Sequence, residues 1–338
     1  MQTAPTAPVL STAPASSSII RPGQPITDFL AAGPVISAEL IPPRNGLSLA
    51  KAVRQMERIV PAGAQFVSVT HGAGGSLRAG TLPLSFIVRQ QFGIESVAHL
   101  TCRDLNPDQL ENALIDHHYL GVTNILALRG DPPGFMKGAT EVPEGHYRYA
   151  YELVEQIAAM NRGAYRSRPD DPNAGAGGYH AGDPTNFCIG VAAYPDAADL
   201  DESVRHLKRK QDAGAHFAIT QMVFSAESYR RFVDAARALG VTLPILPGLR
   251  ILTSAQQAAF MEQHFGVPVP AALKARLGAI PPGDHLAAAR LGAEIGVEAC
   301  VDLCRELLAV GAPGIHVFVM FDSKSAADVI TRVKGLVA

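Results

Sequence analysis

The segment Asn124–Pro133 reads NILALRGDPP and decides the fold. Its first half, residues 125–128, is a short apolar run, as expected for a parallel strand that is buried on both faces. The run ends at Arg129, Gly130 and Asp131, and the two prolines that follow cannot donate to a strand ladder. A buried strand that ends in an arginine and a carboxylate is typical of the catalytic end of an α/β barrel. The alternative is an Arg–Asp pair that only closes a loop.

Other apolar segments of strand length alternate along the chain with segments whose apolar residues recur at helical spacing. Strands are expected at 34–43, 66–74, 95–102, 125–128, 187–195, 215–224, 243–252 and 314–321. This alternation predicts a (β/α)8 TIM barrel rather than an open doubly wound sheet. No G-x-G-x-x-G follows a strand, so a Rossmann nucleotide site is not supported. A single catalytic domain is expected over residues 26–338.

The N-terminal segment, residues 1–25, is rich in Ala, Pro, Thr and Ser. This composition predicts a disordered tail, and the lack of a basic start before an apolar block argues against a signal peptide. The net charge of −2 gives no basic footprint for nucleic-acid binding. No apolar run reaches the ~18 residues of a membrane span. The four cysteines show no C-x-x-C spacing, which favours a reducing cytoplasm and no metal site.

A Gly/Pro-rich insert at 162–186 lies between a predicted helix and the following strand. Such αβ loops lie at the face of a barrel opposite the chemistry. The insert is therefore interpreted as a mobile surface excursion, with a subunit contact as the alternative.

Polar side chains collect where the predicted strands end. They are Glu39, Thr70, His71, His99, Thr101, Arg129, Asp131, Tyr194 and Gln221. Each could be structural on its own, as a cap, a hydrogen-bonded core histidine or a tie for a loop. Because parallel strands end on one rim, the residues are expected to converge there. The set holds two carboxylates but no Ser/His/Asp or Cys/His nucleophile, so it favours general-acid chemistry and recognition of a heterocycle, with a cofactor carrying the rest.

Eight motifs in order carry a resemblance to a known family. They are E-x-x-P-P-R at 39–44, F-V-S-V-T-x-G-A at 66–73, H-L-T-C at 99–102, N-I-L-A-L-R-G-D at 124–131, V-A-A-Y-P at 191–195, L-K-R-K-x-D-A-G-A at 207–215, A-I-T-Q at 218–221 and P-G-L at 247–249. With these motifs the chain resembles methylenetetrahydrofolate reductase from about Pro34 to its last helix.

The resemblance implies reduction of 5,10-methylenetetrahydrofolate to 5-methyltetrahydrofolate by NADH or NADPH, in a ping-pong cycle through bound FAD. Glu39 matches the family's general acid, and Asp131 matches a carboxylate near flavin and pterin. Gln221 and Gln257 match folate contacts. The cofactor-binding positions implied are Thr70, His99, Arg129, Gly130, Asp131, Ala150, Tyr194, Arg209 and Lys210. A cytoplasmic homo-oligomer is also implied.

The chain departs from the family pattern at three places. The segment between Tyr194 and Lys210 is short and lacks an expected His and Asp, which bears on the adenosine end of FAD. Residues 320–324 replace the usual Asn-Arg ending, so Lys324 is a candidate for the folate glutamate tail. His71 stands where a tyrosine is common. The shortened segment is the feature that favours the alternative function, a flavin-free relative that binds folate as a partner subunit or transfers hydride directly.

Overall fold

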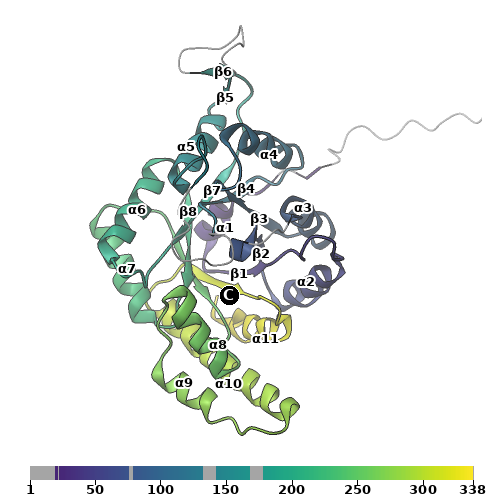
Figure 1. Cartoon of the computed structure of the whole chain (residues 1–338), viewed down its shortest axis with the longest axis vertical. Coiled ribbons are helices and arrows are strands. Elements are labelled where there is room, and N and C mark those ends of the chain that lie inside the picture. Colours follow the sequence, from purple (N-terminus) through teal and green to yellow (C-terminus); the bar gives the residue numbers. More distant parts are fainter. Residues whose placement is uncertain (1–19, 22, 76–78, 132–141, 168–177, 338) are drawn as a thin grey trace, which may run out of the picture.

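The structure is a computed structural model, and it describes residues 20–21, 23–75, 79–131, 142–167 and 178–337. Its centre is a closed barrel of eight parallel strands in the order β1-β10-β9-β8-β7-β4-β3-β2 (Figure 1). The barrel strands are β1 (Val35–Leu40), β2 (Phe66–Val69), β3 (Glu95–Thr101), β4 (Asn124–Leu128), β7 (Cys188–Ala193), β8 (Phe217–Met222), β9 (Ile245–Leu249) and β10 (Gly314–Phe318). This confirms the predicted (β/α)8 barrel. Seven of the predicted strands contain one barrel strand each, and β4 begins one residue before the predicted run at 125–128.

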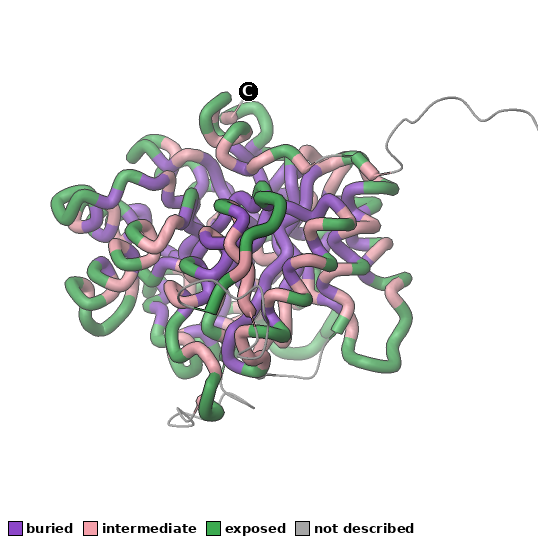
Figure 2. Tube along the Cα trace, turned by 90° about the horizontal axis from the view of Figure 1, so that it is seen from above, coloured by how far each residue is buried: buried purple, intermediate pink, exposed green. Residues whose placement is uncertain are grey.

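Helices surround the barrel and bury one side against it (Figures 1 and 2). They are α1 (Ile26–Ala32), α2 (Ala50–Ala62), α3 (Thr81–Phe92), α4 (Pro107–Tyr119), α5 (Ala150–Met160), α6 (Leu200–Asp212), α7 (Ala226–Ala238), α8 (Ala255–Phe260), α9 (Ala271–Gly278), α10 (His285–Ala309) and α11 (Ser323–Val333). Short turns η1 (Ala73–Gly75), η3 (Met261–Phe265) and η4 (Lys334–Leu336) complete the elements.

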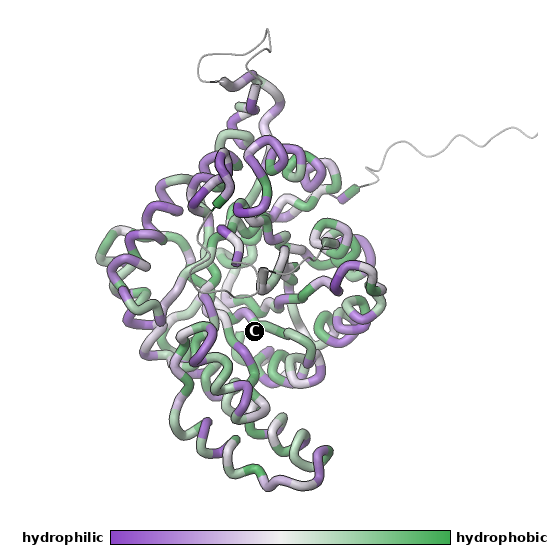
Figure 3. The backbone as a smooth tube through the Cα atoms, viewed as in Figure 1, coloured by the Kyte–Doolittle hydropathy of each residue, from purple (hydrophilic) through white to green (hydrophobic). Residues whose placement is uncertain are grey.

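The outer helices follow the period of the sequence pattern. In α7 the buried Tyr229, Phe232 and Ala236 are three and four positions apart, so they lie on the side that faces the barrel. Figure 3 shows hydrophilic stretches along α6 and α7 on the outside of the molecule. Helix α4 begins at a capping box, in which Asn106 accepts from the backbone of Gln109 at 2.9 Å. These local signals place the helices, and their apolar sides then pack on the strands.

The arms of the Gly/Pro-rich insert form a small hairpin of β5 (Ala164–Arg166) and β6 (Tyr179–Ala181). The hairpin projects from the barrel beside α4 and α5 (Figure 1). Arg166 binds it to α4, because its side chain pairs with Asp108 at 2.6 Å and its backbone donates to Glu111 at 2.9 Å. The ends of the predicted excursion are therefore ordered, and its middle, 168–177, lies outside the described residues.

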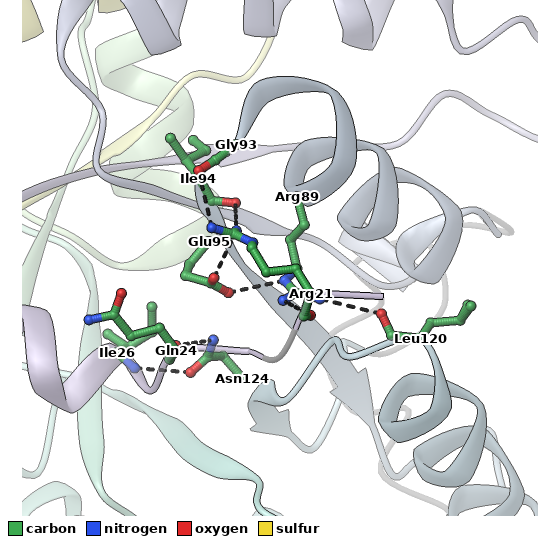
Figure 4. A network of polar contacts seen from close by, with 9 residues as sticks. All are labelled: Arg21, Gln24, Ile26, Arg89, Gly93, Ile94, Glu95, Leu120 and Asn124. Carbon is green, nitrogen blue, oxygen red and sulfur yellow. Dashed lines mark hydrogen bonds and ion pairs between the residues drawn. The ribbon is translucent and has the colours of Figure 1, made fainter. Parts of the chain in front are cut away.

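Helix α1 lies across the N-terminal end of the barrel. Its buried Ile26 packs with Val35 and Phe66, which line the inside of the barrel at that end. The backbone N–H of Ile26 donates to Asn124 Oδ1 at 3.0 Å, and Asn124 donates to the carbonyl of Gln24 at 3.0 Å (Figure 4). This end of the barrel is therefore filled by apolar side chains and covered by a helix.

A buried ion-pair network ties the chain just before α1 to the barrel (Figure 4). Glu95 accepts from Arg21 at 2.9 Å and from Arg89 at 3.1 Å. The Arg89 side chain has no exposed surface, and it also donates to the Arg21 carbonyl at 2.7 Å. Most of the predicted disordered tail, residues 1–19 and 22, lies outside the described residues, but Arg21 within it is held by these bonds.

Candidate active site at the C-terminal ends of the strands

The predicted site residues lie at one end of the barrel. Glu39, His99 and Thr101 are within strands, and Thr70 directly follows one. Arg129 to Asp131 follow β4, Tyr194 follows β7, and Gln221 is the fifth residue of β8. Since the eight strands are parallel and closed, these positions share the C-terminal rim, which we call the mouth.

Beneath the mouth, the barrel interior holds a buried polar cluster of Ser37, Ser68 and His316. The Ser37 hydroxyl lies 2.8 Å from His316 Nδ1, and the Ser68 hydroxyl lies 3.3 Å from its Nε2. Burial lowers the pKa of His316 to about 3, so the ring is neutral. Sequence reasoning missed this cluster, although alternation along β1 puts Ser37 and Glu39 on the same face.

Glu39 is the acid in the mouth, and it is buried, with 9% of its surface exposed. Burial, and to a smaller extent the negative charge of Asp131, raise its pKa from 4.5 to about 8. Both effects disfavour the carboxylate form. Glu39 therefore carries its proton at neutral pH, as a general acid must.

His99 is the neighbour of Glu39 on the β3 side. Its Nε2 lies 3.6 Å from Glu39 Oε2, which is too long for a hydrogen bond. Burial, and to a smaller extent the nearby His316 and His71, lower the pKa of His99 to about 3, so the ring is neutral. Within the described residues, His99 Nε2 and the Thr70 hydroxyl are buried without a hydrogen-bond partner. Unsatisfied buried polar atoms at a mouth are typical of a site whose partner is a ligand.

Asp131 connects two loops of the mouth. Its Oδ2 accepts from the backbone N–H of Gly74 at 3.0 Å. Gly74 has φ 68°, which favours glycine, and Gly130 before Asp131 has φ 97°. A side chain at Gly130 would also lie 3.2 Å from Thr101 Cβ. The loop-closing alternative required an Arg129–Asp131 pair, and no such ion pair occurs in the described part of the mouth; Asp131 bonds to backbone instead.

A basic group occupies the β7 side of the mouth. Lys210 Nζ donates to the carbonyl of Ala192 at 2.7 Å and lies 5.5 Å from the ring centroid of Tyr194. Burial, and then the charge of Arg129, lower the pKa of Lys210 to about 8. Tyr194 is 46% exposed, so one side of its ring remains open. Arg129, Tyr194 and Lys210 were predicted to belong to one site, and the structure places them next to one another.

Two other predicted residues do not join this basic group. Arg209 neighbours Lys210 on α6, but consecutive helix residues point about 100° apart. Its side chain is exposed and makes no hydrogen bond or ring contact among the described residues. Ala150 is the buried first residue of α5 and can contribute only backbone and a methyl group.

The two glutamines present amide N–H groups. Gln221 lies at an irregularity in the pairing of β8 with β9, and a bulge of this kind changes the direction of a side chain. Its Oε1 accepts from the backbone of Met222 at 3.0 Å. Gln257 Oε1 accepts from Thr253 N at 2.9 Å. With both oxygens engaged, the NH2 groups remain to donate to a ligand.

Two classes of feature are absent from the described part of the chain. It contains no cluster of three or more His, Cys, Asp or Glu side chains suited to a metal ion. None of its helices combines the length and the apolar character needed to cross a membrane.

Comparison with known proteins identifies the family. The profile of a family described as methylenetetrahydrofolate reductase matches residues 26–334. Methylenetetrahydrofolate reductase 1 of Schizosaccharomyces pombe is 33% identical over 303 residues, which are 88% of this chain and 45% of that protein. The 5,10-methylenetetrahydrofolate reductase of Escherichia coli is 33% identical over 241 residues, 70% of this chain and 71% of that protein. The chain spans about half the length of the yeast and plant relatives.

A solved structure shares the fold. It is a protein from Clostridium thermocellum that binds two copies of 5-methyl-5,6,7,8-tetrahydrofolic acid. The two chains align with a TM-score of 0.55 at 14% identity, covering 92% of this chain and 98% of that one.

Proposed function

Because the chain belongs to the methylenetetrahydrofolate reductase family, we propose that it reduces 5,10-methylenetetrahydrofolate to 5-methyltetrahydrofolate, with NADH or NADPH as reductant and FAD as cofactor. The rice and maize relatives are named for NADH, which favours that reductant. The observation that carries the proposal is the buried Glu39, whose pKa of about 8 keeps a transferable proton in the mouth. A homo-oligomer in the cytoplasm is part of the proposal.

The residues of the mouth fit a flavin nucleotide. The unpartnered Thr70 hydroxyl and His99 Nε2 offer hydrogen bonds to a heterocycle, and Lys210 and Arg129 offer charge-assisted bonds to a pyrophosphate. We assign its binding to Thr70, His99, Arg129, Gly130, Asp131, Ala150, Tyr194, Arg209 and Lys210. When bound, FAD would accept hydride from the nicotinamide and deliver it to the folate carbon.

Glu39 performs the proton transfer to folate. The methylene carbon of the substrate bridges two nitrogens, and breaking one C–N bond requires a proton on the nitrogen that leaves. Glu39 gives that proton, and the remaining N–C unit becomes an iminium ion that can accept hydride. The Glu39 carboxylate that results lies near Asp131, so two negative charges then stabilise the cation.

Asp131 and the two glutamines orient the substrate. Asp131 uses one oxygen for the Gly74 backbone, which fixes the side chain and leaves acceptor capacity for the amino edge of a pterin. The NH2 groups of Gln221 and Gln257 are donors for carbonyl oxygens of folate and, in turn, of the nicotinamide.

The test is the visible absorbance of the purified protein together with NADH oxidation that depends on methylenetetrahydrofolate. We expect a yellow protein that forms 5-methyltetrahydrofolate. A yellow or colourless protein without folate reduction would overturn the proposed activity. A colourless protein that reduces folate would instead support direct hydride transfer, the alternative favoured by the short segment after Tyr194.

A further inference from the structure

The β5–β6 hairpin projects beside α5 (Figure 1), and a cavity of about 520 Å³ lies between them on the outside of the barrel. Small-molecule sites typically measure ~300–1,000 Å³. The walls come from the loop before α5, from α5 itself and from both strands of the hairpin. Arg166, which binds the hairpin to α4, is one of the lining residues. None of the described residues that line the cavity was assigned to the mouth, so the two are separate.

The buried part of the wall contains Gln156 of α5, which has 2% of its surface exposed. Its Nε2 donates to the carbonyl of Pro107 at 2.8 Å, and this bond fixes the orientation of the amide group. Its Oε1 is buried and has no hydrogen-bond partner among the described residues. A buried acceptor without a partner is unfavourable. A ligand with an N–H donor would supply the missing bond.

Two tyrosine side chains line the cavity from different segments. Tyr147 lies in the loop before α5, and Tyr179 is the first residue of β6, where it is 36% exposed. Burial raises the pKa of Tyr147 to about 12, so its phenol stays neutral. Neutral aromatic side chains favour contact with a planar ring. The two tyrosines therefore suit a flat heterocycle.

The charged groups of the cavity are only partly used by the fold. Arg166 pairs with Asp108 at 2.6 Å, and Glu152 accepts from two backbone N–H groups at the start of α5 at 2.8 and 2.9 Å. The side chains of Glu155 and Arg162 are exposed and form no hydrogen bond or ion pair with the rest of the described chain. Arg162 is seven positions beyond Glu155, about 10 Å further along the helix direction. One cation and one carboxylate thus remain to bind a ligand.

We propose that this cavity binds a nucleoside monophosphate whose base carries an amino group. The base lies against Tyr147 and Tyr179 and donates its amino N–H to Gln156 Oε1. The ribose hydroxyls donate to Glu155, and the phosphate pairs with Arg162. Every group that the fold leaves unused in the cavity then has a partner. The site does not depend on the reaction proposed for the mouth.

The test is equilibrium binding of adenosine 5′-monophosphate to the full chain with saturating FAD and NAD⁺, which fill the nucleotide sites of the mouth. Inosine 5′-monophosphate has an oxygen in place of the amino group, so it should bind at least about fivefold more weakly. Gln156→Leu should remove this preference. Arg162→Ala should weaken binding of adenosine 5′-monophosphate by up to about fivefold and leave adenosine unchanged. Tyr179→Ala should weaken all three ligands by about two- to tenfold.

Arg148→Ala is the matched control for Arg162→Ala, because it removes an exposed charge near the other end of α5, outside the cavity. It should leave all affinities unchanged. Arg162→Ala and Tyr179→Ala should retain wild-type turnover of methylenetetrahydrofolate and the wild-type melting temperature, since both side chains are exposed and lie outside the mouth. Equal affinities of the wild type for the two monophosphates would overturn the proposal. So would displacement of adenosine 5′-monophosphate by NAD⁺, or no binding of it at all.

Discussion

Glu39 Oε2 lies 3.6 Å from His99 Nε2, yet neither group is charged at neutral pH. The pKa of Glu39 is raised to about 8 and that of His99 is lowered to about 3, and burial is the largest cause of both shifts. The proton therefore stays on the carboxyl group, because the imidazole is the much weaker base. The contact is between two neutral groups, and its effect is to keep a buried acid protonated beside a ring that cannot take its proton.

Glu39→Gln should separate the two halves of the reaction. The amide keeps the volume of the side chain but cannot transfer a proton. Turnover with methylenetetrahydrofolate should fall by about 10²–10⁴-fold, the usual contribution of a positioned general acid. NADH oxidation with menadione as acceptor should stay within a few-fold of wild type, since it needs no proton from Glu39. Steady-state rates with each acceptor check this; equal slowing of both, with a lower melting temperature, would mean a structural role.

Folate reduction should depend on pH through Glu39. Because the protonated form is active and its pKa is about 8, kcat/KM for the folate should fall as pH rises through about 8. Asp131→Asn removes a negative charge that raises this pKa, so the falling limb should move to lower pH. Overlapping pH profiles for the wild type and Asp131→Asn would show that the two carboxyl groups do not interact.

The unfolding free energy of the protein should also depend on pH through Glu39, and it should decrease as the pH rises. The folded-state pKa of Glu39 is raised above its ordinary 4.5, so its favourable contribution is complete below pH 4.5 and is lost as pH rises through about 8. A shift of this size corresponds to on the order of 5 kcal/mol at most. The unfolding free energy of Glu39→Gln relative to wild type should therefore increase between pH 5 and pH 9, the range to be covered by urea titrations. A constant difference would contradict the raised pKa.

Lys210→Met should lower the flavin content of the purified protein while leaving the fold intact. The change removes the cation that lies beside Tyr194 and Arg129. Arg209→Ala is the matched comparison on the same helix. Since the Arg209 side chain is exposed and away from this group, its effect should be smaller. Flavin content after gel filtration gives the measurement, and full occupancy in Lys210→Met would remove Lys210 from the phosphate site.

Truncation should show where the N-terminal segment begins to stabilise the barrel. Deleting residues 1–19 should leave the unfolding free energy and turnover unchanged, because their composition cannot offset the entropy of ordering. Deleting residues 1–23 removes Arg21 and so leaves an N–H of the buried Arg89 without its acceptor. An unfulfilled buried donor costs about 1–3 kcal/mol. Equal stability of the two truncated proteins would mean that water replaces Arg21.

The barrel could be predicted because its signals are local and repeated. Short apolar runs alternate with helical periodicity, and caps such as Asn106 mark the ends of helices. Once the strands are parallel and closed, residues at their C-terminal ends must share a rim. Hence Glu39, His99 and Asp131 could be assigned to one mouth without knowledge of any contact between them.

The contacts that refine the site could not be predicted, because they join positions that are far apart in the sequence. The residue types involved are frequent in all proteins and give no specific signal. Ser37 and His316 are 279 positions apart, and neither residue type is diagnostic. The separation of Arg209 from Lys210 depends on the rotation of α6 against the barrel. The β5–β6 hairpin has strands of three residues, too short for a periodic signal.

Helix α1 closes the N-terminal end of the barrel. Ile26 and the apolar side chains above it fill the end of the barrel opposite Glu39. Molecules that reach Glu39 therefore enter and leave through the mouth. A reductant and a folate that enter through the same opening must bind one after the other. Each should therefore act as a competitive inhibitor of the other when it is in excess, and raising folate at a fixed low NADH concentration should first accelerate and then slow the enzyme.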